Sequence, residues 1–194
     1  VSMGDADGTA FCWGDGQYGR LGLGDTNGRT SPTGLVLEGV SQISTGDFQT
    51  CACVDGKAKC WGANWHKRLG VSSLNGQDVG DSEQEMRSLV AVVLPKAVVH
   101  VATGAGHACA LLVTAALYCW GYSLHGQAGG GVSNSEASPG EVRLGQGEKV
   151  VQVSAGHDHT CALLTGANVK CWGRGENGQL GLGSTSNQGT SPSE

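Results

Sequence analysis

The sequence has few of the residues that mark several common protein classes. Only 4 of its 194 residues are proline, and aromatic residues make up 5% of the chain. No apolar run approaches the roughly 20 residues that a membrane-spanning helix needs, so we expect no direct membrane insertion. Lysine and arginine total 12 and form no cluster, and the net charge is −5. Binding through nucleic-acid phosphates needs a basic surface, so nucleic acid is not an expected partner.

Sites for catalysis and modification are also missing. No Asn-x-Ser/Thr sequon is present, so we expect no N-glycosylation. No Ser/His/Asp, Cys/His or paired-carboxylate arrangement stands apart from the repeat described below. The histidines and cysteines at 107, 109, 157, 159 and 161 match no established zinc spacing. The sequence therefore predicts a protein that is not an enzyme and that uses no metal or cofactor.

Glycine, in contrast, is abundant, with 34 residues, and it recurs at fixed places in a repeated unit. The triplet Cys-Trp-Gly begins at residues 12, 60, 119 and 171, at intervals of 48, 59 and 52 residues. A period near 50 residues indicates a repeat architecture. We divide the chain into the second half of a unit (1–14), three whole units (15–62, 63–121 and 122–173) and the start of another (174–194).

Each unit contains a pair of short strands. Gln49–Val54 and Lys57–Trp61 flank Asp55-Gly56, which is a strong signal for a two-residue hairpin turn. Equivalent hairpins are expected within 107–120 and 159–172. Many short strands with one motif per unit predict an all-β fold built from β-propeller blades. Only residues 80–90 have the pattern of a helical turn, with Ser82 or Asp81 as its cap.

The recurring residues resemble the regulator of chromosome condensation repeat. The third whole unit carries the resemblance most clearly, in Val151-Gln-Val-Ser-Ala-Gly156, in His159-Thr-Cys-Ala-Leu-Leu164 and in Gly178-Gln-Leu-Gly-Leu-Gly183 just after it. The resemblance covers essentially the whole chain and implies a propeller of four-stranded blades, usually seven of them. Because this chain supplies about three and a half units, we expect a partial or open propeller.

The hairpins also predict how the cysteines pair. Across the Asp55-Gly56 turn, Cys51 faces Cys60, and Cys53 faces Ala58. Directly opposed antiparallel residues lie roughly 4.5–5.5 Å apart, which is within the range that a disulfide accepts. The same reasoning gives three hairpin disulfides: Cys51–Cys60, Cys109–Cys119 and Cys161–Cys171.

Two cysteines, Cys12 and Cys53, have no opposed partner. Cys53 is either a small buried apolar residue or bonded to Cys12. Recurring disulfides indicate an oxidising compartment, so we expect an extracytoplasmic location: secreted, periplasmic or in an organelle lumen. Because the chain begins at Val1, we also expect it to be a processed or trimmed chain, so that a missing secretory signal is not evidence for the cytosol.

Two recurring features have structural and functional interpretations. The G-x-G-x-x-G runs at 14–19 and 173–178 match a dinucleotide-binding motif, but they are not placed between a strand and a helix, so we interpret them as turns. The tryptophans at 13, 61, 120 and 172 hold one position per unit, which indicates packing between blades; an aromatic ligand site is the alternative.

Two departures from the repeat are the candidate contact sites. Trp65, His66, Lys67 and Arg68 form the one cationic–aromatic run, and such residues often anchor interfaces. The insertion 71–89 carries Asp78, Asp81, Glu83 and Glu85, whose spacing is not that of an EF-hand. The alternative for residues 65–68 is a solvated turn, and the alternative for the insertion is a solvated loop.

The sequence thus favours a non-enzymatic interaction scaffold, or a peripheral subunit of a membrane-associated or extracellular assembly, whose partners are other proteins. The family resemblance implies a second class, a regulator: a secreted enzyme inhibitor, or an exchange factor for a small GTPase. Exchange activity needs a specialised wedge insertion that we do not identify here. A ligand-binding module is the third class.

Overall fold

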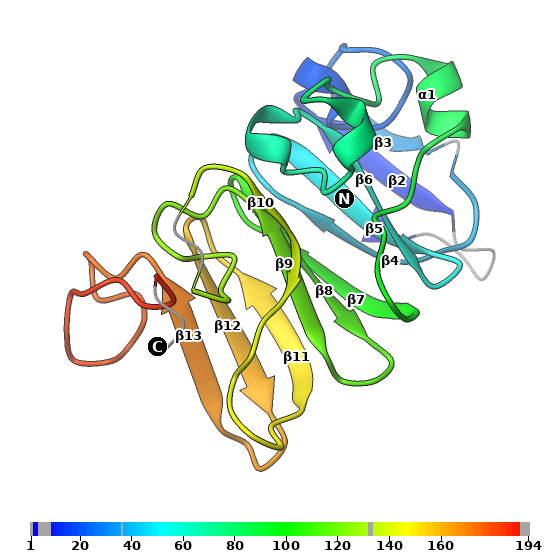
Figure 1. Cartoon of the computed structure of the whole chain (residues 1–194). Helices are drawn as coiled ribbons and strands as arrows, with labels where there is room; N and C mark the ends of the chain where they lie inside the picture. The colour runs from blue at the N-terminus through cyan, green and yellow to red at the C-terminus, as the bar shows by residue number, and fades with distance from the viewer. Residues whose placement is uncertain (1, 4–8, 36, 132–133, 191–194) are drawn as a thin grey trace.

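The strands of each unit pair into one small antiparallel sheet. The structure is a computed structural model that describes residues 2–3, 9–35, 37–131 and 134–190. Within them, four sheets follow one another along the chain (Figure 1). The sheets comprise β1 (Ser2–Met3), β2 (Ala10–Gly14) and β3 (Arg29–Gly34); β4 (Val40–Thr45), β5 (Gln49–Val54) and β6 (Lys57–Gly62); β7 (Val98–Thr103), β8 (His107–Leu112), β9 (Leu117–Gly121) and β10 (Ala137–Glu141); and β11 (Val150–Ala155), β12 (His159–Leu164) and β13 (Val169–Gly173).

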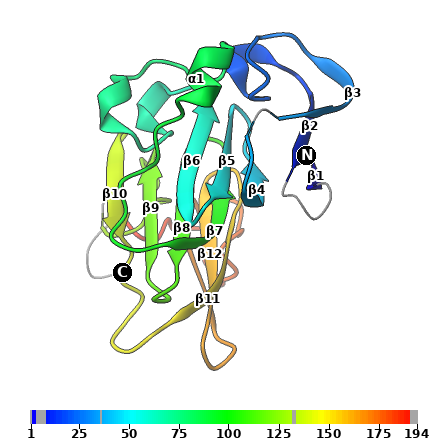
Figure 2. The same cartoon turned by 90° about the vertical axis from the view of Figure 1, so that its right-hand side faces the viewer.

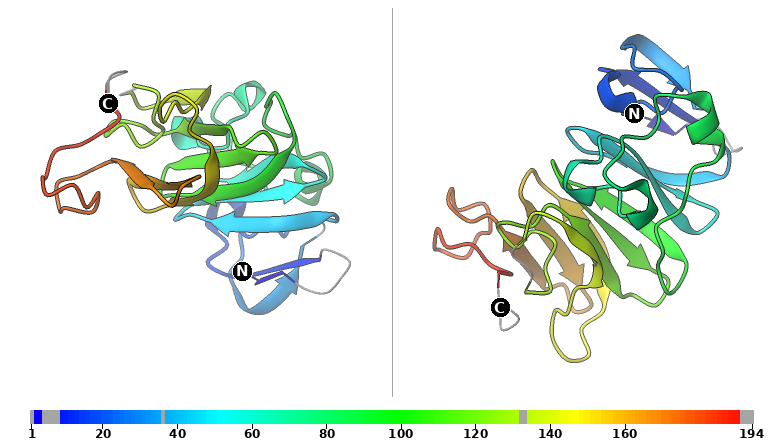
Figure 3. Two further views of the ribbon diagram at one scale, coloured as in Figure 1. Left: turned by 90° about the horizontal axis from the view of Figure 1, so that it is seen from below. Right: turned by 45° about the horizontal axis from the view of Figure 1, so that its top comes forward.

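These sheets are blades of an open β-propeller, as the sequence predicts. They lie side by side from the N-terminal sheet to β11–β13 (Figure 3). Among the described residues, no strand of the last sheet pairs with the first. Buried apolar residues form two clusters, one spanning the first three sheets and the other joining the third sheet to the fourth. The predicted end segments 1–14 and 174–194 include residues 1, 4–8 and 191–194, which lie outside the described residues.

The hairpin register is the predicted one. Cys51 pairs with Cys60 and Cys53 with Ala58, and the corresponding cysteines face each other in the next two hairpins. The structure contains the three disulfides Cys51–Cys60, Cys109–Cys119 and Cys161–Cys171. Cys12 and Cys53 are both free and buried, so the alternative of a bond between them is wrong. The Cys53 thiol instead donates to the carbonyl of Val98, 3.0 Å away, and burial raises the pKa of Cys12 to about 11.

Side chains of the innermost strands link neighbouring blades. The Gln42 amide on β4 makes two hydrogen bonds to the backbone of Val101 on β7, at 2.7 and 3.0 Å. His100 holds the equivalent position on β7, and its Nε2 lies 3.2 Å from the carbonyl of Val153 on β11. The turns after these strands also approach closely, because a Cβ placed on Gly46 would lie only 2.0 Å from the carbonyl oxygen of Gly104. Glycine at this position therefore allows the inner strands to meet.

The recurring tryptophans join blade to blade. The indole N–H groups of Trp61, Trp120 and Trp172 donate to the carbonyls of Arg20, Arg68 and Gln127, respectively, at 3.0–3.2 Å. All three side chains are buried. The packing interpretation is confirmed for these three residues, and it leaves no room for an aromatic ligand site at them. Trp13 differs, with 39% of its surface exposed.

A glycine of the repeat receives each of these indoles. A Cβ on Gly22 or Gly70 would lie 2.6 Å from Nε1 of Trp61 or Trp120, and one on Gly129 would lie 3.1 Å from Nε1 of Trp172. The three glycines have positive φ angles of 66–73°. The glycine at this repeat position thus provides both a left-handed turn and a flat surface for the ring.

The insertion 71–89 folds over the second blade. It contains the short helices η3 (Ser72–Leu74) and α1 (Glu83–Arg87). The predicted helical turn and its cap are confirmed, because the Ser82 side chain accepts a hydrogen bond from the Glu85 amide. Met86 of α1 is buried. The loop after β2 contains η1 (Gln17–Gly19), and the loop after β6 contains η2 (Trp65–Lys67). In the described part of the chain, no helix is both long and apolar enough to span a membrane.

His107 is a structural residue in the contact between the third and fourth sheets. It is fully buried, and its Nε2 lies 2.8 Å from Thr160 Oγ1. Since Thr160 Oγ1 donates its own proton to the Gln127 carbonyl, His107 Nε2 must be the donor in its contact with Thr160 Oγ1. Burial lowers the pKa of His107 to about 4. The imidazole is therefore neutral in the folded protein at pH 7.

The blade contact can be tested with two glycines of the same repeat position. Gly70→Ala places a methyl group against Trp120, whereas Gly181, with φ of 70° against 73° for Gly70, has nothing within 4 Å. We expect both alanine variants to lose about 1–2 kcal/mol from the left-handed backbone, and Gly70→Ala to lose about 1–3 kcal/mol more from overpacking. Urea unfolding with intact disulfides measures the difference. Equal losses would contradict the packing role of Trp120.

The His107 proton balance predicts a pH dependence. Its folded pKa of about 4 lies below the unfolded value of roughly 6.5, so the unfolded chain binds a proton that the folded chain does not. Its contribution to stability is complete above pH 6.5 and declines as the pH falls towards 4, by roughly 3 kcal/mol in total. His107→Gln, which copies Gln49 at the equivalent position, should flatten that decline in urea unfolding. An unchanged decline would exclude His107 as its source.

Candidate interaction surface

One end of the sheets gathers the loops that depart from the repeat. Each hairpin turn, such as 55–56, lies at the opposite end, where Figure 2 shows the turns projecting downwards. The turns after β4, β7 and β11, and the loops after β2, β6, β9 and β13, share the other end with α1. We call this the loop end. It brings residues from several units onto one surface.

Three aromatic residues meet at the loop end. The Trp65 ring centroid lies 4.8 Å from that of Tyr18, in a T-shaped arrangement, and 5.5 Å from that of Phe48. They come from three different loops, which follow β2, β4 and β6. Trp65 keeps 41% of its surface exposed. We call Tyr18, Phe48 and Trp65 the aromatic cluster.

Two arginines lie against the aromatic cluster. The Arg20 guanidinium carbon is 5.0 Å from the Phe48 centroid, and that of Arg68 is 5.3 Å from the Trp65 centroid. Both distances are within the range of a cation–π contact. Arg20 also pairs with Asp15 at 3.3 Å. The cluster therefore combines apolar rings with positive charge.

Arg68 is the more deeply buried of the two arginines. Its Nε and Nη1 donate to the carbonyls of Trp65 and Ala105, both at 2.9 Å, and only 5% of the residue is exposed. Burial lowers the pKa of Arg68, and the more distant Asp78 and Asp47 carboxylates oppose that effect. Arg68 thus points inwards under the rings. In a solvated turn, its side chain would instead lie in water.

The other two residues of the predicted run point elsewhere. The His66 ring lies 5.0 Å from that of Tyr122, and Lys67 Nζ lies 2.7 Å from Glu136 Oε2. This ion pair lowers the pKa of Glu136. Lys67 has a φ of 54°, at a position where the other units have glycine. The run from Trp65 to Arg68 therefore contacts both neighbouring blades, and only Trp65 and Arg68 belong to the aromatic cluster.

The acidic residues of the insertion mostly hold the loop itself. Asp78 Oδ1 accepts from the Asn64 amide at 2.8 Å, and Glu85 Oε2 accepts from the Gly80 amide at 2.9 Å. Burial first, and then the neighbouring Glu85 and Asp78, raise the pKa of Asp81. Glu83 pairs with Arg87 of α1 at 3.4 Å. In the residues that the structure describes, no group of three potential ligands could hold a metal ion.

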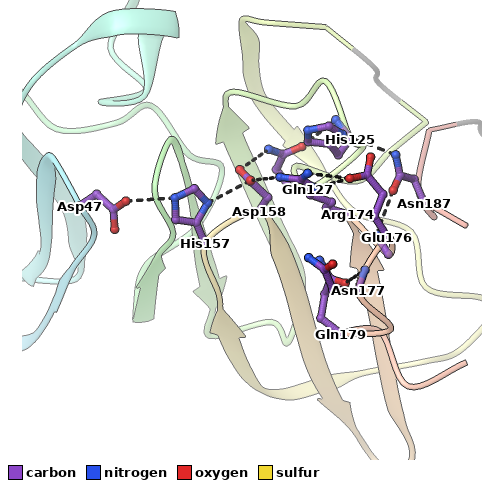
Figure 4. A network of polar contacts seen from close by, with 11 residues as sticks. Asp47, His125, Gln127, His157, Asp158, Arg174, Glu176, Asn177, Gln179 and Asn187 are labelled. Atoms are coloured by element: carbon purple, nitrogen blue, oxygen red, sulfur yellow. Dashed lines mark hydrogen bonds and ion pairs between the residues drawn. The ribbon is translucent and has the colours of Figure 1, made fainter. Parts of the chain in front are cut away.

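A polar network crosses the loop end beside the cluster (Figure 4). His157 lies between two carboxylates, with Nε2 3.2 Å from Asp47 and Nδ1 2.9 Å from Asp158. Each ring nitrogen thus faces a carboxylate oxygen from a different turn. Arg174 and Gln127 also reach Asp158, at 3.6 and 3.4 Å. The network links the turn of the second sheet to that of the fourth.

Models of the regulator of chromosome condensation (RCC1) repeat match residues 7–53, 98–127, 115–163 and 150–179. The chain belongs to this repeat family. It is 35% identical to the ultraviolet-B receptor UVR8 of Arabidopsis thaliana over 91% of this chain and 40% of the receptor. It is 33% identical to the E3 ubiquitin-protein ligase HERC2 of Homo sapiens, over 82% of this chain and 3% of the ligase. The chain thus spans less than half the length of either relative.

Two solved structures share the fold. Human WBSCR16 superposes with a TM-score of 0.77 at 24% identity, over 94% of this chain and 47% of that one. Yeast RCC1 (Prp20), in its structure with Kap60, gives a TM-score of 0.75 at 22% identity, over 99% of this chain and 49% of that one. At these identities the likeness shows a common propeller architecture.

The exposure pattern predicts which tryptophans meet solvent. Trp13 and Trp65 are 39% and 41% exposed, and the other three are at most 5% exposed. We expect neutral acrylamide to quench the wild-type emission in part, and the double variant Trp13→Phe, Trp65→Phe to resist quenching. Stern–Volmer titration of both proteins measures this. Strong quenching of the double variant would contradict the burial of the three blade-joining indoles.

Proposed function

We propose that this chain is a non-enzymatic protein-interaction module that presents its loop end to another protein. The observation that carries the proposal is the aromatic cluster, in which Trp65 is 41% exposed although it packs against two other rings. Tryptophan, tyrosine and arginine are the residues most often found at energetic centres of protein interfaces. Here all three occur together on one surface.

The surroundings of the cluster support this role. Its rings come from three loops that are held by blade contacts below them, including the Trp61 and Trp120 hydrogen bonds. A surface that is already ordered loses little conformational entropy when it binds. The cluster is therefore suited to a preformed interface.

The partners named for structural neighbours are also proteins. Yeast RCC1 (Prp20) was solved with Kap60 bound, and a second Prp20p structure is described together with its binding to Gsp1p and histones. We carry over from them only the general role, a propeller surface that binds protein.

We further propose that the chain works outside the cytosol as a scaffold or peripheral subunit of a larger assembly. Three disulfides within one short repeat domain support an oxidising compartment. A regulator, such as an inhibitor of a secreted enzyme, would use the same surface and is the second candidate. The identity of the bound protein separates the two: structural partners support a scaffold, and an enzyme whose activity falls supports a regulator.

The decisive experiment is cross-linking mass spectrometry of the native full-length protein without reductant. We expect cross-links to a fixed partner through residues 63–71 and the turn 46–48, and a loss of at least tenfold in those cross-links for Trp65→Ser. Trp13→Ser is the matched control, since Trp13 is 39% exposed but lies outside the cluster. If Trp65→Ser leaves the cross-links unchanged, or if Trp13→Ser removes them equally, the loop-end interface is wrong.

A further inference from the structure

This inference rests on the proposed function and concerns the chemistry of the partner. The starting point is the charge of Arg68. Among the residues that the structure describes, Arg68 forms no ion pair, although it is only 5% exposed. A buried charge without a counterion costs free energy, so such charges are normally paired.

Nearby carboxylates are already engaged with other groups. Asp15 pairs with Arg20, and Asp47 pairs with His157. Asp78 accepts from the Asn64 backbone. The cation–π contact with Trp65 holds the guanidinium in place, but it does not cancel its charge. In the described part of the chain, no carboxylate therefore lies within ion-pair distance of Arg68, and Asp78 and Asp47 act on its charge only from farther away.

The fold itself does not need a charge at this position. Arg20 and Arg68 hold the repeat position at which the later units have Gln127 and Gln179. The backbone carbonyls of Arg68 and Gln127 accept the same indole hydrogen bond, from Trp120 and Trp172. The Gln127 side chain, which is neutral, is buried and bonded to Asp158. Because a neutral glutamine can occupy this position in the later units, the positive charges of Arg20 and Arg68 indicate a role in binding and not in folding.

We propose that the aromatic cluster with Arg20 and Arg68 receives an acidic segment of the partner protein. A carboxylate of that segment faces the small part of Arg68 that stays exposed and accepts from Nη2, because Nε and Nη1 already donate to backbone carbonyls. An apolar side chain next to it packs on the exposed part of Trp65. Charge-assisted hydrogen bonds to guanidinium are among the strongest in proteins, and the surrounding rings exclude water from them.

Three synthetic peptides test this. Each is a biotinylated 12-mer with leucine at the same positions, and the remaining positions are all Glu, all Gln or all Lys. Biolayer interferometry with the full chain at 0.15 M salt should show the Glu peptide binding roughly tenfold more tightly than the Gln peptide, with no binding of the Lys peptide. Binding of the Gln peptide as tightly as the Glu peptide, or no Glu-peptide binding at 1 mM, would overturn the proposal.

Variants locate the effect. Arg68→Gln, which copies the later units, should abolish the preference for Glu over Gln, and Arg68→Lys should keep most of it. Arg87→Gln is the control, because Arg87 is an exposed arginine of α1 away from the cluster. Thermal melting confirms that each variant is folded; if Arg68→Gln is not, Arg20→Gln, which also copies the later units, should weaken the preference for Glu, and an unchanged preference in that variant would overturn the proposal. An equal loss in Arg87→Gln would show a general charge effect and overturn the proposal.

Different results would contradict the acidic partner segment and the proposed interaction surface. If native cross-links pass through the Trp65 loop to a partner segment without acidic residues, the interaction surface stands and the acidic partner is wrong. If Trp65→Ser leaves the native cross-links intact, the proposed surface itself is wrong, whatever the peptides show.

Discussion

The structure depends on one contact that recurs at each blade junction: an indole N–H donating to a backbone carbonyl of the preceding loop, with the ring lying on a glycine. Trp61, Trp120 and Trp172 make this contact in turn. Each junction needs a tryptophan at the end of one strand and a glycine one loop earlier, which is why the two residues recur in phase. The contact also sets the loop backbone at Arg20 and Arg68. The functional surface is therefore built directly on the blade junctions.

The sequence predicted the features that arise within one unit. The cysteine pairing follows from a two-residue turn and strand register, and the Ser82 cap follows from local backbone chemistry, so neighbouring residues decide both. The repeat resemblance extended this to the fold. The packing predicted for the four recurring tryptophans holds for Trp61, Trp120 and Trp172, whereas Trp13 has the same phase in the repeat and is 39% exposed.

Contacts between units were harder to foresee. Phe48 and Tyr18 lie far from Trp65 in the chain, and nothing in their own segments shows that the three rings meet. In the sequence, Arg68 belongs to a cationic run, whereas in the structure its side chain is buried and Lys67 pairs with Glu136 on a neighbouring blade. The pairing of His157 with Asp47 crosses the intervening turn, where Ala105 and Gly106 have no long side chain. One signal was available: arginine in the first two units at a glutamine position of the later ones.

The placement of the disulfides has a mechanical consequence. Each bond closes a single hairpin, and in the described residues none connects two blades. Tension applied along the chain would therefore separate the blades at their tryptophan junctions before it extended the cross-linked hairpins. Each hairpin would remain closed and keep its strands in register. A stretched molecule would thus consist of separate disulfide-closed hairpins joined by extended loops. Each hairpin would pack against its neighbour again once the load was released.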